Sequence, residues 1–282
     1  MSGCADDNNE FFLLRPEWPL PEGVRSVITL RSAWTGPQRQ LKLNDHEPRC
    51  PAGQDADAVS RPLSQSYGKG LKQSSRQRRV LARQLGSDIS VQWLNQVHGA
   101  KVVEASFDDA QPDADASYSR AENLACAVMT ADCLPVLIAV RDGSAVAAAH
   151  AGWRGLAAGV IGATVQALKV EPAMLSVYLG PAICARHFEV GSEVLSAFLE
   201  KPWIKTLARA GRLDRVFQPS RSRPGHYQGD LYALARLELQ DMGVQDIYGG
   251  EFCSYGQPRW FYSHRRGQDV GRTASLIWIA PA

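Results

Sequence analysis

The sequence has little net charge and no long hydrophobic run. Its 282 residues carry 31 Lys and Arg against 29 Asp and Glu, which gives a net charge of +2 at pH 7. This balance excludes the strong basic field that nucleic-acid-binding proteins use, so we expect no nucleic-acid partner. The most apolar stretch, residues 124–140, contains Thr130, Asp132 and Pro135, so we expect no membrane span either.

Cysteine and histidine are also scarce. The chain has six of each, with no Cys-x-x-Cys pair, and so few cysteines in 282 residues do not form a dense disulfide framework. The first ten residues lack the basic start and apolar core of a secretory signal. We therefore expect a cytoplasmic protein with reduced thiols.

The pattern of short apolar runs predicts one α+β domain. Hydrophobic residues at 45% and charged residues at 21% are ordinary globular values, and no internal repeat or linker divides the chain. We predict a polar lead-in at residues 1–23 and one domain over 24–282, with a flexible loop at 44–73. Strands are predicted at 24–30, 91–97, 101–105, 125–129, 134–140, 145–150, 176–179, 245–248 and 274–279, and helices at 75–85, 156–169, 192–199 and 230–242.

Three side chains that bind metals lie at the ends of predicted apolar strands. They are His98, Cys133 and His150. Strand ends gather at one rim of a sheet, where loops build binding sites. Two imidazoles and a thiolate suit Zn²⁺ or copper, and three protein ligands leave a fourth position for water, as in catalytic zinc sites.

The same residues allow other chemistries. Cys133 is also a candidate nucleophile with His150 or His98 as its base. A His₂Cys set also describes a blue-copper centre, although too few histidines remain for a conventional trinuclear cluster. The structural alternative is that the Cys133 side chain is a small apolar residue of the core. Asp132, beside Cys133, is a candidate general acid or a residue that orients a ligand histidine, whereas Asp113 and Asp115 are interpreted as loop residues.

Several arginines are candidates for binding an anion. Arg154 lies in a Gly-Trp-Arg-Gly turn between a predicted strand and a predicted helix, where a guanidinium can bind phosphate. Arg265 and Arg266, with Arg272 close behind, are candidates to close a phosphate or nucleotide pocket, and Arg31 ends the first predicted strand. The alternative is that these side chains are solvated surface charges.

Seven motifs of the chain resemble one known family. They are LNQVHG (94–99), DADASY (113–118), CAVMTADCLPVLI (126–138), AAAHAGWRGLAAGV (147–160), LGPAI (179–183) with FEVG (188–191), CSY (253–255), and FYSHRR with GR (261–272). Together they resemble the laccase-domain family, also called YfiH-like or polyphenol oxidase-like proteins. The resemblance covers about residues 24–280. The chain departs from the family pattern after Arg31, where paired glycines are missing, and at His264, which replaces a tyrosine.

The resemblance implies a fold, a metal site and an activity. The fold is a single α+β domain with mixed β-sheets layered between helices, similar to the catalytic domain of cytotoxic necrotizing factors. The implied metal ligands are His98, Cys133 and His150, with Zn²⁺ or Cu²⁺ as the ion. The implied activity is that of a purine nucleoside phosphorylase acting on adenosine, inosine and methylthioadenosine, with adenosine deaminase activity; its partners are a nucleoside and phosphate.

The resemblance also suggests roles and leaves alternatives open. Zinc would polarise a water that attacks C6 of the purine, with Asp132 protonating the leaving amine. Arg154, with Arg31, Arg265 or Arg266, would hold the phosphate. The alternatives are a copper-dependent polyphenol oxidase, a metal-free Cys133–His150 hydrolase, and a non-catalytic zinc protein linked to editing of peptidoglycan precursors.

Overall fold

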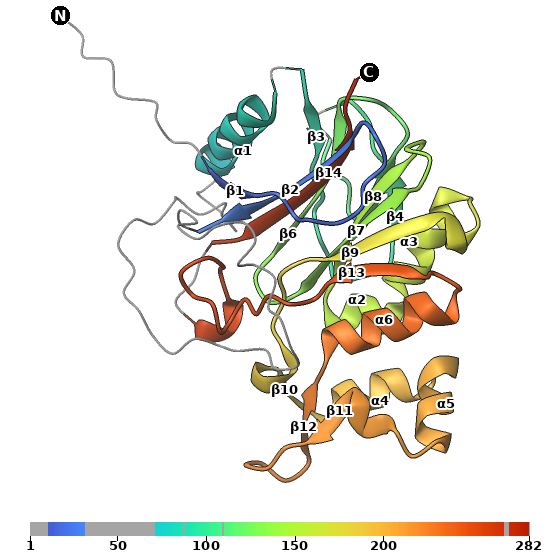
Figure 1. Cartoon of the computed structure of the whole chain (residues 1–282). Helices are drawn as coiled ribbons and strands as arrows, with labels where there is room; N and C mark the ends of the chain where they lie inside the picture. The colour runs from blue at the N-terminus through green and yellow to red at the C-terminus, as the bar shows by residue number, and fades with distance from the viewer. Residues whose placement is uncertain (1–10, 32–70, 87, 109, 268–270, 282) are drawn as a thin grey trace, which may run out of the picture.

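Two large β-sheets are stacked face to face, with helices on both outer faces (Figure 1). The computed structural model describes residues 11–31, 71–86, 88–108, 110–267 and 271–281, and the side chains of 71–76 are outside this description. Both sheets contain parallel and antiparallel neighbours, which confirms the predicted α+β domain with mixed sheets layered between helices.

The first sheet has five strands in the order β1-β2-β14-β6-β3. Their bounds are Phe12–Leu14 (β1), Val24–Leu30 (β2), Ser90–Gln92 (β3), Leu124–Thr130 (β6) and Thr273–Ile279 (β14). The strand that comes last along the chain, β14, lies in the middle and pairs antiparallel with β2 and β6. Residues 11–23, expected to form a lead-in, contain β1 and place Leu14 and Trp18 in the core, so the folded domain begins before residue 24.

The second sheet has six strands in the order β13-β9-β7-β8-β5-β4. Their bounds are Val102–Glu104 (β4), Ala116–Ser119 (β5), Leu134–Val140 (β7), Val146–Ala151 (β8), Leu175–Leu179 (β9) and Asp246–Gly249 (β13). Strands β7 and β8, predicted at 134–140 and 145–150, form an antiparallel hairpin. Along β7, Val136 and Ile138 face the helices while Leu137 and Ala139 face the first sheet, as the two-residue period of a strand requires.

Helices cover the outer faces of both sheets. The side chain of Leu81 in α1 packs with Met129 and Trp278 on the first sheet, and the helices after β8 pack on the second sheet. A small sheet in the order β10-β12-β11 lies beside α4 and α5 (Figure 1). The bounds are Leu71–Leu85 (α1), Trp153–Ala158 (α2), Val160–Leu168 (α3), Pro172–Met174 (η2), Ala185–His187 (η3), Glu189–Gly191 (β10), Ser192–Leu199 (α4), Pro202–Arg209 (α5), Leu213–Arg215 (η4), Phe217–Pro219 (β11), His226–Gly229 (β12), Leu231–Asp241 (α6) and His264–Arg266 (η5).

Three predicted segments differ from the structure. The helix expected at 156–169 is two helices, because Gly159 adopts φ +90° and breaks the hydrogen-bond ladder between α2 and α3. Residues 208–226, where no strand or helix is predicted, contain η4 and β11 and reach the first residue of β12. The strand expected at 91–97 stops at Gln92, so the residues that follow are free to form a loop.

The remaining expectations concern the N-terminal part and membranes. The predicted flexible loop at 44–73 lies outside the described residues except for 71–73, which begin α1. Within the described ranges, every helix is too short or too polar to cross a bilayer.

A buried carboxyl group on α6 makes the stability of the fold depend on pH. Burial raises the pKa of Glu238 from 4.5 to about 7, although the Gly162 N–H donates to its Oε1 (3.2 Å). Its Oε2 has no partner among the described residues. Because the folded state holds this proton more tightly than the unfolded state, the stabilisation is complete below about pH 4.5 and is lost as the pH rises through about 7.

Glu238→Gln is therefore expected to stabilise the protein only at neutral and higher pH. We expect a gain of about 2 kcal/mol in the free energy of unfolding at pH 8, and almost none at pH 4.5 where both side chains are neutral. Urea unfolding of both proteins at the two pH values measures the difference. An equal effect at both pH values would contradict the assignment of the effect to this proton.

Candidate active site

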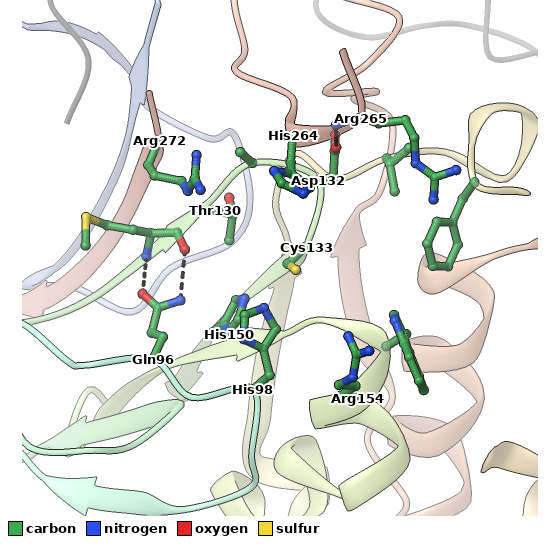
Figure 2. Close-up of a pocket in the computed structure, with 15 residues that line it drawn as sticks. Gln96, His98, Thr130, Asp132, Cys133, His150, Arg154, His264, Arg265 and Arg272 are labelled. Atoms are coloured by element: carbon green, nitrogen blue, oxygen red, sulfur yellow. Dashed lines mark hydrogen bonds between the residues drawn. The ribbon is translucent and has the colours of Figure 1, made fainter. Parts of the chain in front are cut away.

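A pocket of about 320 Å³ lies where the two large sheets meet the helix layer (Figure 2). Its lining comes from segments far apart in the sequence, including the β6–β7 connection, the end of β8, the start of α2 and the η5 turn. The lining residues are Gln96, His98, Met129, Thr130, Ala131, Asp132, Cys133, His150, Trp153, Arg154, Ile183, Phe188, His264, Arg265 and Arg272.

Strand geometry explains how the three predicted ligands meet. Val146 and Ala148 of β8 face the first sheet, so His150, two residues further along, continues on the same face. Cys133 lies in the connection that passes from β6 in the first sheet to β7 in the second. His98 lies on the loop after β3 with φ +62°, a conformation that is uncommon for residues other than glycine.

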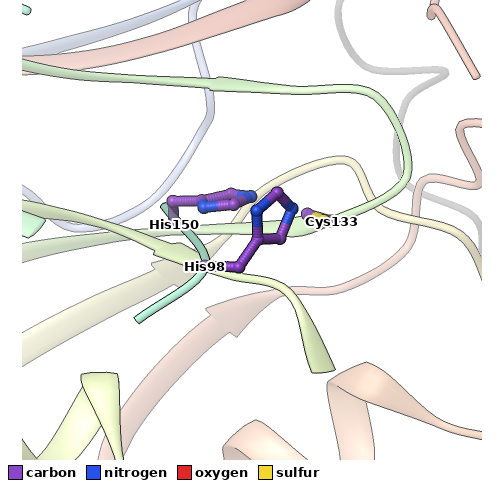
Figure 3. A group of neighbouring side chains, drawn as sticks. All are labelled: His98, Cys133 and His150. Carbon is purple, nitrogen blue, oxygen red and sulfur yellow. The ribbon is translucent and has the colours of Figure 1, made fainter. Parts of the chain in front are cut away.

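The side chains of His98, Cys133 and His150 converge (Figure 3). One ligand atom of each lies within 4.8 Å of the others, and the two imidazole rings are 4.8 Å apart at 77°. Ligand atoms on one tetrahedral zinc lie roughly 3.3 to 3.8 Å apart, so side-chain shifts of about 1 Å bring this set onto one cation. Two imidazole nitrogens and a thiolate are a donor set for zinc or copper.

Asp115 holds two of these ligands in place. Its carboxylate accepts a hydrogen bond from His150 Nδ1 (2.7 Å) and from the backbone N–H groups of His98 (2.9 Å) and Gly99 (2.6 Å). With the proton on Nδ1, the lone pair of His150 Nε2 is available to a cation. Asp115 lies in the loop directly before β5, as expected, but its side chain is 0% exposed and contacts the ligand residues. Its position directly before the buried strand β5 is the sequence feature that could have indicated a buried carboxylate.

The site stabilises a thiolate. Burial raises the pKa of the Cys133 thiol, but the charge of His150 and hydrogen bonds with His150 and His98 outweigh it and lower the pKa to about 6. Burial lowers the pKa of His150, but the Cys133 charge and the Asp115 hydrogen bond raise it to about 9. Without a metal, the pair is a thiolate beside an imidazolium. The thiolate is the form of cysteine that ligates metals and acts as a nucleophile.

Gly152 lets α2 begin directly against the ligands. A Cβ atom at this position would lie 2.8 Å from Cys133 Sγ and 3.4 Å from His98 Cδ2. Its backbone angles, φ −65° and ψ 164°, suit any residue. The requirement for glycine here is therefore one of space beside the sulfur.

Gly152→Ala is expected to lower zinc affinity about 10- to 100-fold while leaving the fold intact, because the added methyl group displaces the Cys133 sulfur. Competition with a chromophoric chelator measures the affinity, and circular dichroism checks the fold. Gly162→Ala on α3, outside the pocket lining, is the matched control and should bind zinc normally. Normal affinity in Gly152→Ala would show that the sulfur does not need this space.

Asp132 connects the Cys133 segment to the C-terminal part of the chain. Its carboxylate accepts hydrogen bonds from Ser254 Oγ (2.6 Å), Ser263 Oγ (2.9 Å) and the Arg265 N–H (2.7 Å). Its backbone has φ +93°, in the left-handed region. These three donors hold the β6–β7 connection at the pocket wall; the role of Asp132 as a proton donor stays a prediction.

The predicted arginines separate into two groups. Arg154 and Arg265 line the pocket, and Arg272 joins them (Figure 2). Arg31 lies outside the lining, where it donates to the Pro258 carbonyl (3.2 Å). Arg266 also lies outside it and donates to the carbonyl groups of Ser254 (2.6 Å), Tyr255 (2.7 Å) and Phe261 (2.5 Å). The structure therefore brings three of the five candidate arginines together at the pocket.

Gln96 is a site residue that sequence reasoning missed. Its side-chain amide donates to the Met129 carbonyl and accepts from the Met129 N–H, both at 2.8 Å (Figure 2). This pair of hydrogen bonds fixes the His98 loop against the end of β6. Nothing in the local pattern of the loop points to this distant partner.

The fold and the pocket define the class of protein. A two-sheet sandwich with an arginine-lined pocket around a His₂Cys set is the arrangement of an enzyme with a candidate metal centre. The chain belongs to the family described as multi-copper polyphenol oxidoreductase laccase, whose model matches residues 61–280. This confirms the laccase-domain resemblance.

Relatives match nearly the whole chain. A Pseudomonas aeruginosa protein named purine nucleoside phosphorylase is 42% identical over 268 residues, which cover 94% of this chain and 98% of that protein. Purine nucleoside phosphorylase YfiH of Escherichia coli is 39% identical over 270 residues, covering 95% and 98%. The crystal structure of the Neisseria meningitidis protein NMB0706 has a TM-score of 0.76 at 40% identity and covers 95% of this chain and 99% of that one.

Proposed function

We propose that this protein is a metal-dependent purine nucleoside phosphorylase acting on adenosine, inosine and methylthioadenosine, with adenosine deaminase activity. The observation that carries the proposal is a pocket that combines the His98, Cys133 and His150 ligand set with three arginines. Relatives at 39–42% identity are named purine nucleoside phosphorylase, which supports the phosphorylase part of the proposal.

Phosphorolysis requires a pocket that holds both the phosphate and the purine. The bond from C1′ of the ribose to the purine breaks, a bond from C1′ to a phosphate oxygen forms, and the leaving base takes up a proton. Arg154, Arg265 and Arg272 supply positive charge for the phosphate. Trp153 and Phe188, which also line the pocket, offer aromatic faces to the purine.

Other residues of the site assist metal binding and proton transfer. His98, Cys133 and His150 would hold the cation, and zinc or copper bound there supplies Lewis-acid polarisation. Asp115 keeps the His150 proton on Nδ1. Asp132 is the candidate proton donor to the leaving group, and its hydrogen bonds to Ser254 and Ser263 hold it at the wall. The same pocket would admit water to C6 of adenosine for deamination.

A product assay tests the proposal. Zinc-loaded protein is incubated with adenosine and phosphate, and adenine, ribose 1-phosphate, inosine and hypoxanthine are followed by chromatography. We expect ribose 1-phosphate in an amount equal to adenine and hypoxanthine together, and inosine where deamination occurs. Absence of all these products would overturn the proposal.

An arginine pair tests the phosphate contact. Arg154→Ala should raise the KM for phosphate about tenfold or more, because one charge-assisted hydrogen bond is lost. Arg141→Ala is the matched control, since Arg141 pairs with Asp246 (2.8 Å) at the surface and lies outside the pocket lining. A similar change in both variants would remove Arg154 from the phosphate site.

Two other activities have specific support. The family description favours a copper-dependent polyphenol oxidase, which copper-loaded protein oxidising phenols without any nucleoside cleavage would demonstrate. The thiolate beside His150 favours a Cys–His hydrolase. An enzyme that stays active after chelation and is inactivated by thiol alkylation would establish the hydrolase instead.

A further inference from the structure

A second group of metal-binding side chains lies outside the pocket lining. Cys184, His187 and Cys253 each offer one ligand atom within 4.8 Å of the others. The Nδ1 atom of His187 is 3.2 Å from Cys184 Sγ and 3.3 Å from Cys253 Sγ. None of the three belongs to the described lining of the first pocket.

Two chain segments that are hydrogen-bonded to each other bring this cluster together. Cys184 precedes the single turn η3, which carries His187 three residues later, so both side chains point the same way. Cys253 follows β13 and forms a bridge with Ala182, reinforced by the hydrogen bond from Ser254 N–H to the Ala182 carbonyl (2.9 Å). The cluster therefore rests on backbone pairing rather than on a chance meeting of flexible side chains.

The surroundings of Cys253 favour a thiolate. The N–H groups of Cys184 (3.4 Å) and Gly256 (3.3 Å) donate to its sulfur. The Cys184 thiol and these N–H groups outweigh burial and lower the pKa of Cys253. Cys126 is the contrast inside the same molecule, since burial raises the pKa of that thiol to about 12.

The imidazole is also held in place. The ring of His187 packs against Tyr255 with centroids 4.6 Å apart and an angle of 33°. His187 is half-buried, whereas Cys184 and Cys253 are buried. A cation would therefore reach two enclosed sulfurs from the side of a partly exposed nitrogen.

We propose that Cys184, His187 and Cys253 form a second metal site that binds Zn²⁺ through two thiolates and the His187 Nδ1. Zinc ligand atoms lie roughly 3.3 to 3.8 Å apart, so the two sulfur–nitrogen distances widen by only a few tenths of an ångström. Two sulfurs and one nitrogen are among the softest donor sets a protein offers, which suits zinc over magnesium or calcium. The remaining thiol protons leave to solvent when the ion binds.

The second site supports the wall of the first pocket. Ser254, next to Cys253, donates to Asp132, and the N–H of Ile183, next to Cys184, donates to the Asp132 carbonyl (3.0 Å). Ile183 and Phe188, on either side of the η3 segment, line the first pocket. Zinc at the second site would pin these two segments together.

Counting zinc ions in matched variants tests the proposal. Each protein is loaded with zinc, separated from free ion by gel filtration, and measured by elemental analysis. We expect two ions per wild-type chain and one in Cys133→Ala, which keeps only the second site. Cys133→Ala/Cys253→Ser should hold none, while Cys133→Ala/Cys126→Ser keeps one because Cys126 belongs to neither cluster.

Cobalt spectroscopy and a more conservative variant distinguish the loss of a metal ligand from misfolding. Co²⁺ bound to Cys133→Ala should give a thiolate-to-metal charge-transfer band, and Cys133→Ala/His187→Gln should lose it while circular dichroism stays unchanged. If Cys133→Ala holds no more zinc than Cys133→Ala/Cys253→Ser, the proposal is overturned. A Cys184–Cys253 disulfide together with no zinc on the reduced protein would also overturn it. The metal count does not depend on whether nucleosides are the substrates.

Discussion

Cys133→Ala is expected to remove the metal from the first pocket and to lower nucleoside phosphorolysis by about a thousandfold or more. The sulfur is the one anionic ligand of the set, and its thiolate is stabilised by His150 and His98. Loss of the Lewis acid removes several kcal/mol of transition-state stabilisation, which corresponds to a factor of this size. Steady-state kinetics with adenosine and phosphate, alongside elemental analysis, measures both effects.

The matched control for this change is Cys126→Ala. Cys126 is a buried thiol on β6 that lies outside the pocket lining, so its replacement should leave kcat and metal content within a few-fold of wild type. A Cys133→Ala enzyme that keeps wild-type turnover would exclude the sulfur as a ligand and as a nucleophile. A variant that loses turnover while its metal content stays at the wild-type value would favour the Cys133–His150 hydrolase instead.

Asp115→Asn is expected to lower zinc affinity about 10- to 100-fold and to reduce turnover with it. The change keeps the shape of the side chain but removes the charge that accepts from His150 Nδ1 and from the His98 and Gly99 N–H groups. An amide can turn its NH₂ group toward His150, which then rotates or changes tautomer. Because the carboxylate is fully buried, we also expect a loss of about 2 kcal/mol in the free energy of unfolding.

Asp113→Asn is the control two residues away. Asp113 accepts from Asn95 Nδ2 (2.7 Å) in an exposed hydrogen bond, so its replacement should alter neither zinc affinity nor turnover. Zinc competition, kinetics and urea unfolding on both variants distinguish the two carboxylates. Wild-type zinc affinity in Asp115→Asn would show that this hydrogen bond does not orient the ligand.

Sequence alone predicts much of the second sheet and the meeting of the three ligands. The strand at 134–140 has the predicted bounds, because a run of β-branched and aliphatic residues between turn signals suits a strand buried on both faces. The helix predicted at 230–242 begins as α6 after its N-cap Asp230, whose side chain accepts from the Ala233 N–H (3.0 Å). The predicted convergence of His98, Cys133 and His150 is found, although His150 lies inside β8 and His98 lies on a loop.

Residues whose role depends on distant partners could not be predicted in the same way. Asp115 stands between Ala114 and Ala116, and its role follows from hydrogen bonds to the His98 loop and to His150. Arg265 and Arg266 are neighbours, but the η5 turn sends one to the pocket and the other to backbone carbonyl groups. Local sequence does not determine which of two adjacent side chains on a single helical turn points into the pocket.

The central place of β14 in the first sheet affects how the protein folds during its synthesis on the ribosome. Residues 273–279 pair with β2 on one side and β6 on the other, so those two strands have no direct contact as neighbours until this segment has been synthesised. Such distant pairing folds slowly, because a long loop must close before any contact is gained. A growing chain would therefore hold β2 and β6 without their shared neighbour through most of translation, and the first sheet would be completed only near the end.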